Sequence, residues 1–518
     1  MIPSEVISKF FSKELTSDEQ AAIEENATAL GVSRLQMMES AGSAVARFVL
    51  SKYDVRGKNV VVVAGIGNNG GDGFVAARYL ANSGARVDLI LLGSPTAIRT
   101  EEARRNWNAL ASTSVNVGLH WVTDSKDLAK FDKVFEETSL VIDAILGTGV
   151  KGDLKEPIAS AVRKINSVKV PVIAVDIPSG LNPDTGEVLG DAVRARYTVT
   201  FHKMKRGFKN SVDKTGEVII ADIGIPVEAE LMTGPGDVKL VIKPRLPFTH
   251  KWDYGMVLVI GGSERYSGAP ALAAMSALRT GAGLSVVAAP DSVANTIRSY
   301  SPNLIVRPLK GRVFNSGHLE EVVGLLERCR ATVVGPGLGT EEETAKATLS
   351  TLEILADRRT PTVVDADALN CIVGHLEILK GGKFILTPHA GEFERLIGKK
   401  TPERWFQRIE LAIDFAKEFG CTLLLKGHET VITDGDRLKV DTSGTAALAI
   451  GGSGDVLSGI IGTFLAWGSD TFKSGSAAAY VLGSAGKLAQ IDKGFHLVAS
   501  DLIERIPSVL MKYDIEEK

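Results

Sequence analysis

The chain has 518 residues, which is too long for one hydrophobic core and predicts two domains. Hydrophobic residues make up 44% and charged residues 23%, an ordinary balance for a globular protein, and the formal net charge is -3. This balance excludes the strongly basic surface with which proteins bind nucleic acid or an anionic membrane.

The cysteines and the N-terminus narrow the class further. Cys329, Cys371 and Cys421 are widely spaced, without a C-x-x-C pair, which favours buried small side chains in a reducing cytoplasm over disulfides or a thiolate metal site. The first five residues lack a basic segment followed by an apolar one, so we expect no secretory signal. No uncharged apolar run reaches about 18 residues, so we expect no membrane span.

The first half of the chain alternates helices with apolar strands. Residues 16–19 offer a helix cap followed by acids, and a second helix is predicted from Ser33 to about Leu50. Strands are predicted at 59–64, 86–92, 141–143 and 172–176, with a helix at 74–83. This alternation predicts a doubly wound parallel sheet of the α/β class, in which ligands bind beyond the carboxyl ends of the strands.

Prolines and glycines interrupt this rhythm between residues 225 and 250, and a second α/β series follows. We therefore predict two domains, 1–236 and 237–518. The strands predicted in the second domain are 256–260, 284–289, 331–334, 362–365, 384–386 and 422–425, and its long helices are 402–419, 453–466 and 475–490.

Residues 65–73 form a glycine-rich loop after the first strand. The loop begins with G-x-G-x-x-G, which is typical of a dinucleotide site, but the next strand ends without the acid that would hold a ribose. Two amides and a carboxylate, Asn68, Asn69 and Asp72, add groups beyond what a phosphate cradle needs. The structural alternative is a tight turn without a ligand, which five glycines in nine residues disfavour.

Two further strands end in aspartates. Asp143 precedes a Gly-Thr-Gly sequence, and Asp176 precedes Ile-Pro-Ser-Gly. An aspartate at a strand end often only caps the next helix, but three such loops on one sheet edge favour a shared site. Asn69, Asp143 and Ser179 offer the oxygen ligands that small hard cations prefer, and Asp176 remains to exchange a proton with substrate.

Residues 68–73, 143–149 and 176–180 resemble the NAD(P)H-hydrate epimerase domain over about residues 10–225. The resemblance implies a Rossmann-like fold that interconverts the R and S epimers of hydrated NADH and NADPH. It also implies catalysis by Asp176 and a potassium ion at Asn69, Asp143 and Ser179. The substrate residues that it implies are Asn68, Asn69, Gly70, Gly71, Asp72, Gly147, Thr148, Gly149, Val150, Lys151, Gly152, Asp153 and Asp176.

Four loops follow strands in the second half, at residues 335–339, 387–394, 426–430 and 451–455, and none matches a P-loop. The last of them places three glycines and a serine before Asp455 at a predicted helix start. Such a loop binds anions through backbone N–H groups, and the carboxylate can take a proton from a hydroxyl, which together suit phosphoryl transfer.

The charged residues and the histidine of these four loops also have structural explanations that need no ligand. Asp455 could be an ordinary acid in the first turn of a helix, Lys426 a solvated surface lysine, and His389 a structural histidine. Glu392 and Glu394 either bind magnesium through water or face solvent.

The four loops and residues 365–370 resemble the ADP/ATP-dependent NAD(P)H-hydrate dehydratase of the ribokinase-like superfamily over about residues 240–510. The resemblance implies dehydration of the S epimer with ADP, or alternatively ATP, and Mg²⁺, with Asp455 as the base. The implied substrate residues are Gly337, His389, Ala390, Gly391, Glu392, Phe393, Glu394, Arg395 and Asp455. The implied nucleotide residues are Lys426, Gly427, His428, Glu429, Thr430, Thr445, Ala446, Ala447, Leu448, Ala449, Ile450, Gly451, Gly452, Ser453 and Gly454.

The two resemblances together predict a bifunctional isomerase and lyase that repairs a damaged metabolite. One alternative is an ATP-dependent kinase that releases a stable phosphorylated metabolite, and another is a nucleotide sensor whose N-terminal domain binds without reacting. We expect hydrated NADH, hydrated NADPH and ADP as small-molecule partners, no nucleic-acid or membrane partner, a homo-oligomer and a cytoplasmic location.

Overall fold

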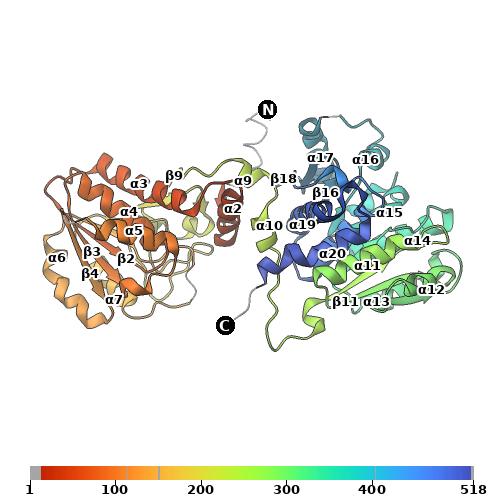
Figure 1. The fold of residues 1–518 in the computed structure, drawn as a ribbon, viewed down its shortest axis with the longest axis horizontal. Coiled ribbons are helices and arrows are strands. Elements are labelled where there is room, and N and C mark those ends of the chain that lie inside the picture. Colours follow the sequence, from red (N-terminus) through yellow and green to blue (C-terminus); the bar gives the residue numbers. More distant parts are fainter. Residues whose placement is uncertain (1–12, 114, 150–151, 403, 515–518) are drawn as a thin grey trace. The chain divides into compact units, whose positions relative to one another are not determined.

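The chain forms two compact units in a computed structural model that describes residues 13–113, 115–149, 152–402 and 404–514 (Figure 1). The N-terminal unit ends at Val227 and the C-terminal unit begins at Glu228. Residues 228–236, which the sequence analysis places in the first domain, therefore belong to the second unit. The reason is local packing, because α9 (Glu228–Leu231) contacts β18 (Leu438–Asp441) and Met232 bridges Val440.

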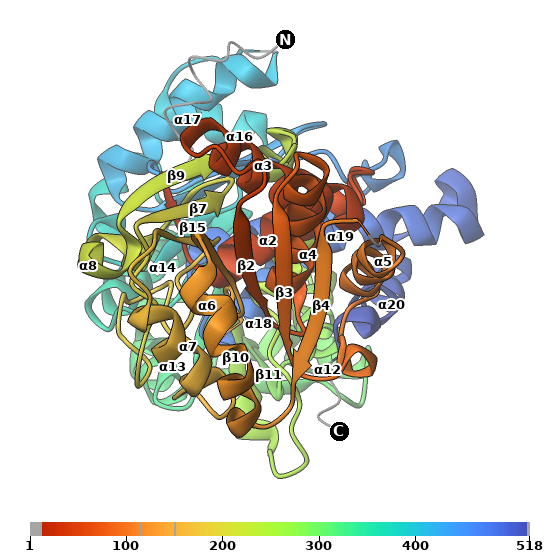
Figure 2. The same cartoon turned by 90° about the vertical axis from the view of Figure 1, so that its left-hand side faces the viewer.

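The N-terminal unit is built on a seven-stranded parallel sheet with the order β4-β3-β2-β5-β6-β7-β9. Its strands are β2 (Asn59–Ala64), β3 (Arg86–Leu92), β4 (Val117–Val122), β5 (Leu140–Ala144), β6 (Val172–Val175), β7 (Tyr197–Phe201) and β9 (Glu217–Ala221). Figure 2 shows β4, β3 and β2 side by side. The strand order reverses between β2 and β5, which is where doubly wound sheets bind ligands.

Helices cover both faces of this sheet. Side chains of a strand point alternately to the two faces, so the apolar run in β2 packs on both sides. Val61 and Val63 join the cluster formed with α6 and α7, whereas Val62 and Ala64 lie against Gly73 of α4. The helices are α3 (Arg34–Lys52), α4 (Asn68–Asn82) and α5 (Glu101–Ala111), then α6 (Asp132–Glu137) and α7 (Ile158–Ser167).

A short parallel pair, β1 (Glu14–Leu15) with β8 (Met204–Lys205), fixes the start of the described chain. α2 (Ser17–Ala29) follows it, and the predicted cap is confirmed because Thr16 and Glu19 form a capping box. Ser33 caps α3 in the same way, as the sequence predicts. The pairing with β8 brings α2 to the same end of the sheet as Lys205.

The C-terminal unit contains a nine-stranded sheet with the order β12-β11-β10-β13-β14-β15-β16-β17-β18. Its strands are parallel as far as β16, and β17 and β18 are antiparallel. They are β10 (Met256–Ile260), β11 (Leu284–Pro290), β12 (Ile305–Leu309), β13 (Ala331–Val334), β14 (Thr362–Val364), β15 (Phe384–Leu386), β16 (Thr422–Leu425), β17 (Thr430–Thr433) and β18 (Leu438–Asp441).

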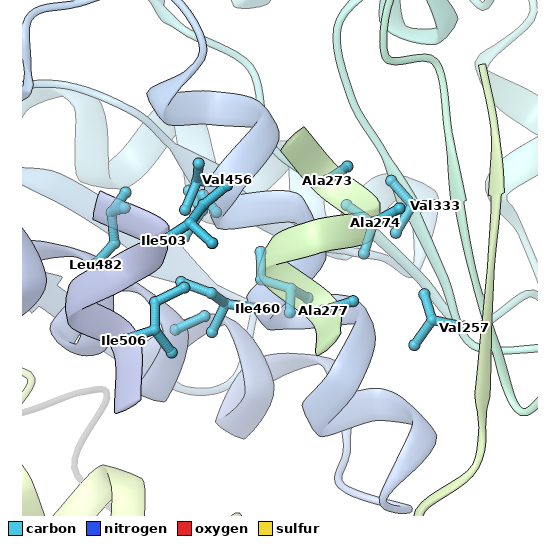
Figure 3. Packing of buried hydrophobic residues seen from close by; sticks show 14 of the residues in the cluster. Val257, Ala273, Ala274, Ala277, Val333, Val456, Ile460, Leu482, Ile503 and Ile506 are labelled. Carbon is cyan, nitrogen blue, oxygen red and sulfur yellow. The ribbon is translucent and has the colours of Figure 1, made fainter. Parts of the chain in front are cut away.

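Two hydrophobic clusters fill the space between this sheet and its helices. In the first, Val456 and Ile460 of α18 pack with alanines of α11, isoleucines of α20, and Val257 and Val333 of the sheet (Figure 3). The helices of this layer are α11 (Gly268–Thr280), α18 (Ser453–Ala466), α19 (Thr471–Lys493) and α20 (Ala499–Leu510). The helices of the opposite layer are α13 (Leu319–Leu326), α14 (Glu342–Asp357), α15 (Asp367–Cys371), α16 (Ala390–Ile397) and α17 (Trp405–Phe419).

None of the described helices has both the length and the apolar character needed to cross a membrane. The long apolar segment at 453–466 is instead the buried helix α18. Cys371 and Cys421 are buried as predicted, and Cys329 is half-buried.

We predict that Gly459→Ala destabilises the C-terminal unit, because α18 and α11 touch at this glycine. A Cβ atom there would lie 1.9 Å from Ser276 Oγ and 2.1 Å from the Ala273 carbonyl oxygen. Overpacking of this kind costs about 1–3 kcal/mol, which exceeds the roughly 1 kcal/mol that alanine gains over glycine in a helix. Gly324→Ala in α13 is the matched control, since no atom lies within 4 Å of its Cβ position. Urea unfolding should show Gly459→Ala weakened and Gly324→Ala unchanged or strengthened, and equal stability of the two variants would contradict the prediction.

Candidate active sites

The first cavity has a volume of about 420 Å³ and lies at the carboxyl ends of β2, β5 and β6. Its walls are the loop after β2, the first turn of α4, the loop after β5, and Asp176 after β6. α2 and α3 complete the walls, with Glu24, Arg34 and Met38 among the side chains that they contribute. The cavity therefore occupies the crevice created by the reversal of strand order.

The glycine-rich segment predicted as a loop is in part the beginning of α4. The helix starts at Asn68, whereas the sequence predicts a start at residue 74. A Cβ atom at Gly70 would lie 1.9 Å from the Gly65 carbonyl oxygen, and one at Gly73 would lie 2.5 Å from Ala144 Cβ. Only glycine lets the helix approach the loop and the sheet this closely, so tertiary packing rather than helix propensity sets its start.

The three residues predicted to hold a cation converge around Leu146. Asp143 is fully buried and accepts hydrogen bonds from the Ser179 N–H (2.8 Å), the Ser179 hydroxyl (2.6 Å) and the Ile145 N–H (3.3 Å). The Leu146 N–H donates to Ser179 Oγ, and Asn69 Nδ2 donates to the Leu146 carbonyl. Burial raises the pKa of Asp143 to about 6 against these hydrogen bonds.

This cluster fits a hard monovalent cation. Asn69 Oδ1 is buried and has no hydrogen-bond partner among the described residues. Leaving such an oxygen unsatisfied costs about 1–3 kcal/mol, which an ion could offset. The neighbouring oxygens come from a carboxylate and a hydroxyl, which are hard donors. Within the described ranges no group of three or more His, Cys, Asp or Glu side chains is arranged for a metal ion.

Asp176 forms a buried ion pair with Lys205. Its Oδ1 lies 3.0 Å from Lys205 Nζ and also accepts from the Thr200 hydroxyl and the Phe201 N–H. The Lys205 side chain is 1% exposed, and its ammonium also donates to the carbonyls of Phe201 and Lys203. This cation stabilises the negative charge on the Asp176 carboxylate. The contacts described for Asp176 involve Oδ1, which leaves Oδ2 to react.

Two further carboxylates share the cavity with Asp176. Burial raises the pKa of Asp72 well above its usual range, and the charges of Asp176 and Glu24 raise it further. Burial also raises the pKa of Glu24. A hydrogen bond with Gln20 opposes this rise, and the charge of Asp176 adds to it. Asp72 and Glu24 therefore bind a proton more readily than exposed carboxyl groups do, which suits a cavity in which protons are exchanged.

The structure brings together most of the substrate residues that the resemblance implies for this domain. Those that line the cavity are Asn68, Asn69, Asp72, Gly147, Thr148, Gly149 and Asp176. Gly70 and Gly71 lie behind the wall, where their missing side chains make room for Gly65 and Met38. Gly152 and Asp153 are not part of the lining, and Val150 and Lys151 lie outside the described residues.

The second cavity, with a volume of about 670 Å³, lies between the ends of β16 and β18 and the start of α18. The implied nucleotide residues that line it are Lys426, Gly427, His428, Thr430, Thr445, Ala446, Leu448, Ala449, Ile450, Ser453 and Gly454. Glu429, Ala447, Gly451 and Gly452 do not line it. Ala447 is buried, and the Glu429 carboxylate pairs with His428.

The start of α18 is suited to an anion. The helix begins at Ser453, as predicted, after Gly452, whose φ of +91° is a left-handed conformation that favours glycine. The first N–H groups of a helix lack partners within it and carry positive partial charge. A Cβ atom at Gly454 would lie 3.2 Å from Lys426 Nζ, so the lysine ammonium rests against this turn. Backbone dipoles and a cation therefore converge on one point of the cavity wall.

Asp455 lies in the same turn, half-buried. Burial, together with the nearby charge of Asp365, raises the pKa of Asp455 to about 7, although Lys426 opposes this rise. Asp365 is 2% exposed, with Oδ1 3.2 Å from Lys426 Nζ and Oδ2 2.7 Å from Ser458 Oγ. A carboxyl group that titrates near neutral pH is well suited to take a proton from a hydroxyl.

The residues at 389–395 mostly have structural partners. His389 lines the second cavity, yet it also caps α16, because its Nδ1 accepts from the N–H groups of Gly391 and Glu392. Phe393 is fully buried and packs against Phe415, so its side chain belongs to the core.

The remaining implied substrate residues of this domain lie outside the second cavity lining. Glu392 accepts from the His389 N–H, Glu394 accepts from Thr401, and Arg395 donates to Asn370. Gly337 has a φ of +64° and leaves room for Tyr266, and Ala390 lies in the first turn of α16.

Sequence reasoning missed several residues that shape the two sites. Glu24, Arg34 and Lys205 belong to the first site, and Asp365 and Ser458 surround Asp455 in the second. Lys205 lies in the basic run 202–206, a pattern typical of a solvated surface. The sequence does contain a feature that points to Asp365 as a site residue, because Asp365 stands at the end of a buried strand as Asp143 and Asp176 do.

Comparisons with known proteins show which families the two units resemble. Residues 34–207 match the family model described as YjeF-related protein N-terminus, and residues 257–508 match the one described as NAD(P)H-hydrate dehydratase. A crystal structure of an ADP/ATP-dependent NAD(P)H-hydrate dehydratase from Bacillus subtilis, co-crystallised with ATP and Mg²⁺, is 28% identical. It matches 54% of this chain and 96% of its own, with a TM-score of 0.46.

Two archaeal relatives match nearly the whole chain. The bifunctional NAD(P)H-hydrate repair enzyme Nnr of Pyrobaculum aerophilum is 44% identical over 510 residues, covering 97% of this chain and 99% of its own. The protein of the same name from Methanothermobacter thermautotrophicus is 42% identical over 498 residues, covering 95% and 94%. Since the likeness extends through both units, the chain belongs to the family of bifunctional NAD(P)H-hydrate repair enzymes.

Proposed function

We propose that the chain repairs hydrated NADH and NADPH at two active sites. The N-terminal unit interconverts the R and S epimers, and the C-terminal unit dehydrates the S epimer with ADP, giving NAD(P)H, AMP and phosphate. The observation that best supports this proposal is that each unit has its own cavity with an aspartate at or beside it, because Asp176 lines the first cavity and Asp455 follows Ser453 and Gly454, which line the second. The name of the relatives favours repair over a kinase with a stable product. A homo-oligomeric state and a cytoplasmic location are part of the proposal.

In the epimerase, Asp176 is the base that exchanges a proton with the substrate. Lys205 pairs with its Oδ1 from the core side, and Asp176 lines the cavity. Asn69, Asp143 and Ser179 would hold potassium, which would supply positive charge to the buried Asp143 carboxylate. Asn68, Asp72 and the 147–149 loop are placed to contact the substrate.

In the dehydratase, Asp455 takes the proton of the C6 hydroxyl, and the resulting oxygen attacks the terminal phosphoryl group of ADP, releasing AMP. The C6–O bond then breaks, phosphate leaves, and loss of a proton from the adjacent carbon restores the double bond. Lys426 and the first N–H groups of α18 hold the charge on the phosphoryl oxygens. Mg²⁺, when bound with the nucleotide, would supply further positive charge.

The two aspartates should have separable roles. Asp455→Asn should abolish the recovery of reduced-nicotinamide absorbance from both epimers. Asp176→Asn should slow only the R portion, by about 100-fold or more, because positioned proton transfer contributes rates of that order. An equal mixture of the two variants should repair both epimers, since each supplies the site that the other lacks. Failure of the wild-type protein with both ADP and ATP would contradict the proposed function.

Dehydration should depend on pH through Asp455. Because the base must be ionised and burial raises the pKa of Asp455 to about 7, kcat/KM for the S epimer should fall as the pH drops through that value. One pH unit below the pKa, about one-tenth of the limiting rate should remain. The measurement is a pH profile at saturating ADP and Mg²⁺. A profile that stays flat down to pH values typical of exposed aspartates would rule out this assignment.

Potassium should act on the N-terminal unit alone. Replacing K⁺ by Li⁺ should slow epimerisation and leave dehydration of the S epimer unchanged. Rising K⁺ concentration should also raise the unfolding temperature of the N-terminal unit, because a ligand bound only to the folded state stabilises it. Asn69→Ala should remove both responses. The measurement is scanning calorimetry in KCl and in LiCl of equal ionic strength. If K⁺ raised the unfolding temperature of Asn69→Ala as much as that of the wild-type protein, the assignment would be disproved.

A further inference from the structure

Asp365 connects three elements around the base of the C-terminal site. It follows β14, and its two oxygens have different partners: Lys426, which follows β16, and Ser458 of α18. Ser458 lies one turn after Asp455 on the same helix, so the two side chains occupy one face. Asp365 therefore fixes the strand-end lysine and the helix that carries the base at the same time.

The backbone around Asp365 is held in an uncommon geometry. Ala366 has a φ of +49°, which is strained for a residue with a side chain. A Cβ atom at Gly335 would lie 1.8 Å from the Asp365 carbonyl oxygen, so the preceding strand end approaches as closely as glycine allows. Strain of this kind persists only where the surroundings over-determine the conformation. It indicates that the position of this carboxylate matters.

Four charged groups face one another here: Asp365, Asp367, Lys426 and Asp455. Burial alone would raise the pKa of Asp365, but Lys426, followed by the hydroxyl of Ser458, holds it below its usual value. Asp365 is therefore a fixed negative charge. The negative charge of Asp365 raises the pKa of Asp455, and the positive charge of Lys426 lowers it. Asp367, whose carboxylate accepts a hydrogen bond from the Gly339 N–H, also raises the pKa of Asp455.

We propose that Asp365 is a positioning residue of the dehydratase, which holds the Lys426 ammonium against the first turn of α18 and keeps a negative charge beside Asp455. The inference rests on the function proposed for the C-terminal unit. When a nucleotide phosphate attracts Lys426, the charge of Asp365 is less compensated, and Asp455 becomes a stronger base. Nucleotide binding and proton removal are thereby coupled through one carboxylate.

The test compares pH profiles of kcat/KM for the S epimer at saturating ADP and Mg²⁺. Asp365→Asn should move the acid limb to lower pH by about one unit, as expected for loss of one charge at short range. Lys426→Met should move it in the opposite direction, because a cation beside Asp455 is removed. Ser458→Ala, which removes the hydroxyl contact but no charge, is the matched control and should leave the limb in place.

A merely structural role would lower the rate by the same factor at every pH in Asp365→Asn and Ser458→Ala, and that result would overturn the proposal. A limb that moves in the same direction in Asp365→Asn and Lys426→Met would also overturn it. Absence of dehydration by the wild-type protein is a different outcome, because it removes the proposed function itself. Epimerase activity of each variant confirms that the purified chain is active in its other unit.

Discussion

The cost of burying carboxylates at the ends of parallel strands is the constraint on which both sites depend. An ionised carboxylate that leaves water must regain its solvation from hydrogen bonds or a cation, or else become neutral. Asp143 receives three hydrogen bonds, Asp176 a lysine and two donors, and Asp365 a lysine and a serine. Burial nevertheless raises the pKa of Asp143 as well as the pKa values of Asp72 and Asp455. Both sites therefore contain carboxyl groups whose burial is only partly offset, and these groups bind a proton more readily than exposed ones.

Close approach of the backbone delivers these carboxylates to their positions. In the N-terminal unit, Gly65 and Gly70 bring the loop after β2 against the start of α4, where Asn69 donates a hydrogen bond to the Leu146 carbonyl in the loop that follows Asp143. In the C-terminal unit, Gly335 performs the corresponding role beside Asp365. In both sheets these glycines lie close to the strands at which the strand order reverses. The topology of the sheet therefore determines where the chain needs residues without side chains.

Much of the fold follows from sequence because buried parallel strands are continuous apolar runs. The predicted strands at 256–260 and 331–334 and the helix at 453–466 have the predicted limits. β12 is missed because Arg307 and Pro308 interrupt it, and β17 and β18 because they are short, antiparallel and partly polar. The positions of the two sites also follow from the sequence, because aspartates at the ends of predicted strands mark them. The partners of these aspartates do not follow from the sequence, since Lys205 lies 29 residues after Asp176 and Glu24 lies in α2, far from it along the chain.

The two lysine–aspartate pairs illustrate how burial assigns roles within the same chemical pair. Lys205 is 1% exposed and is held by two carbonyls in addition to Asp176, so it cannot leave. In the proposed proton exchange Asp176 is therefore the reacting member, and its lysine stays in place. Lys426 is 25% exposed, whereas its partner Asp365 is 3% exposed. Here the lysine faces the nucleotide cavity and the aspartate is the fixed member.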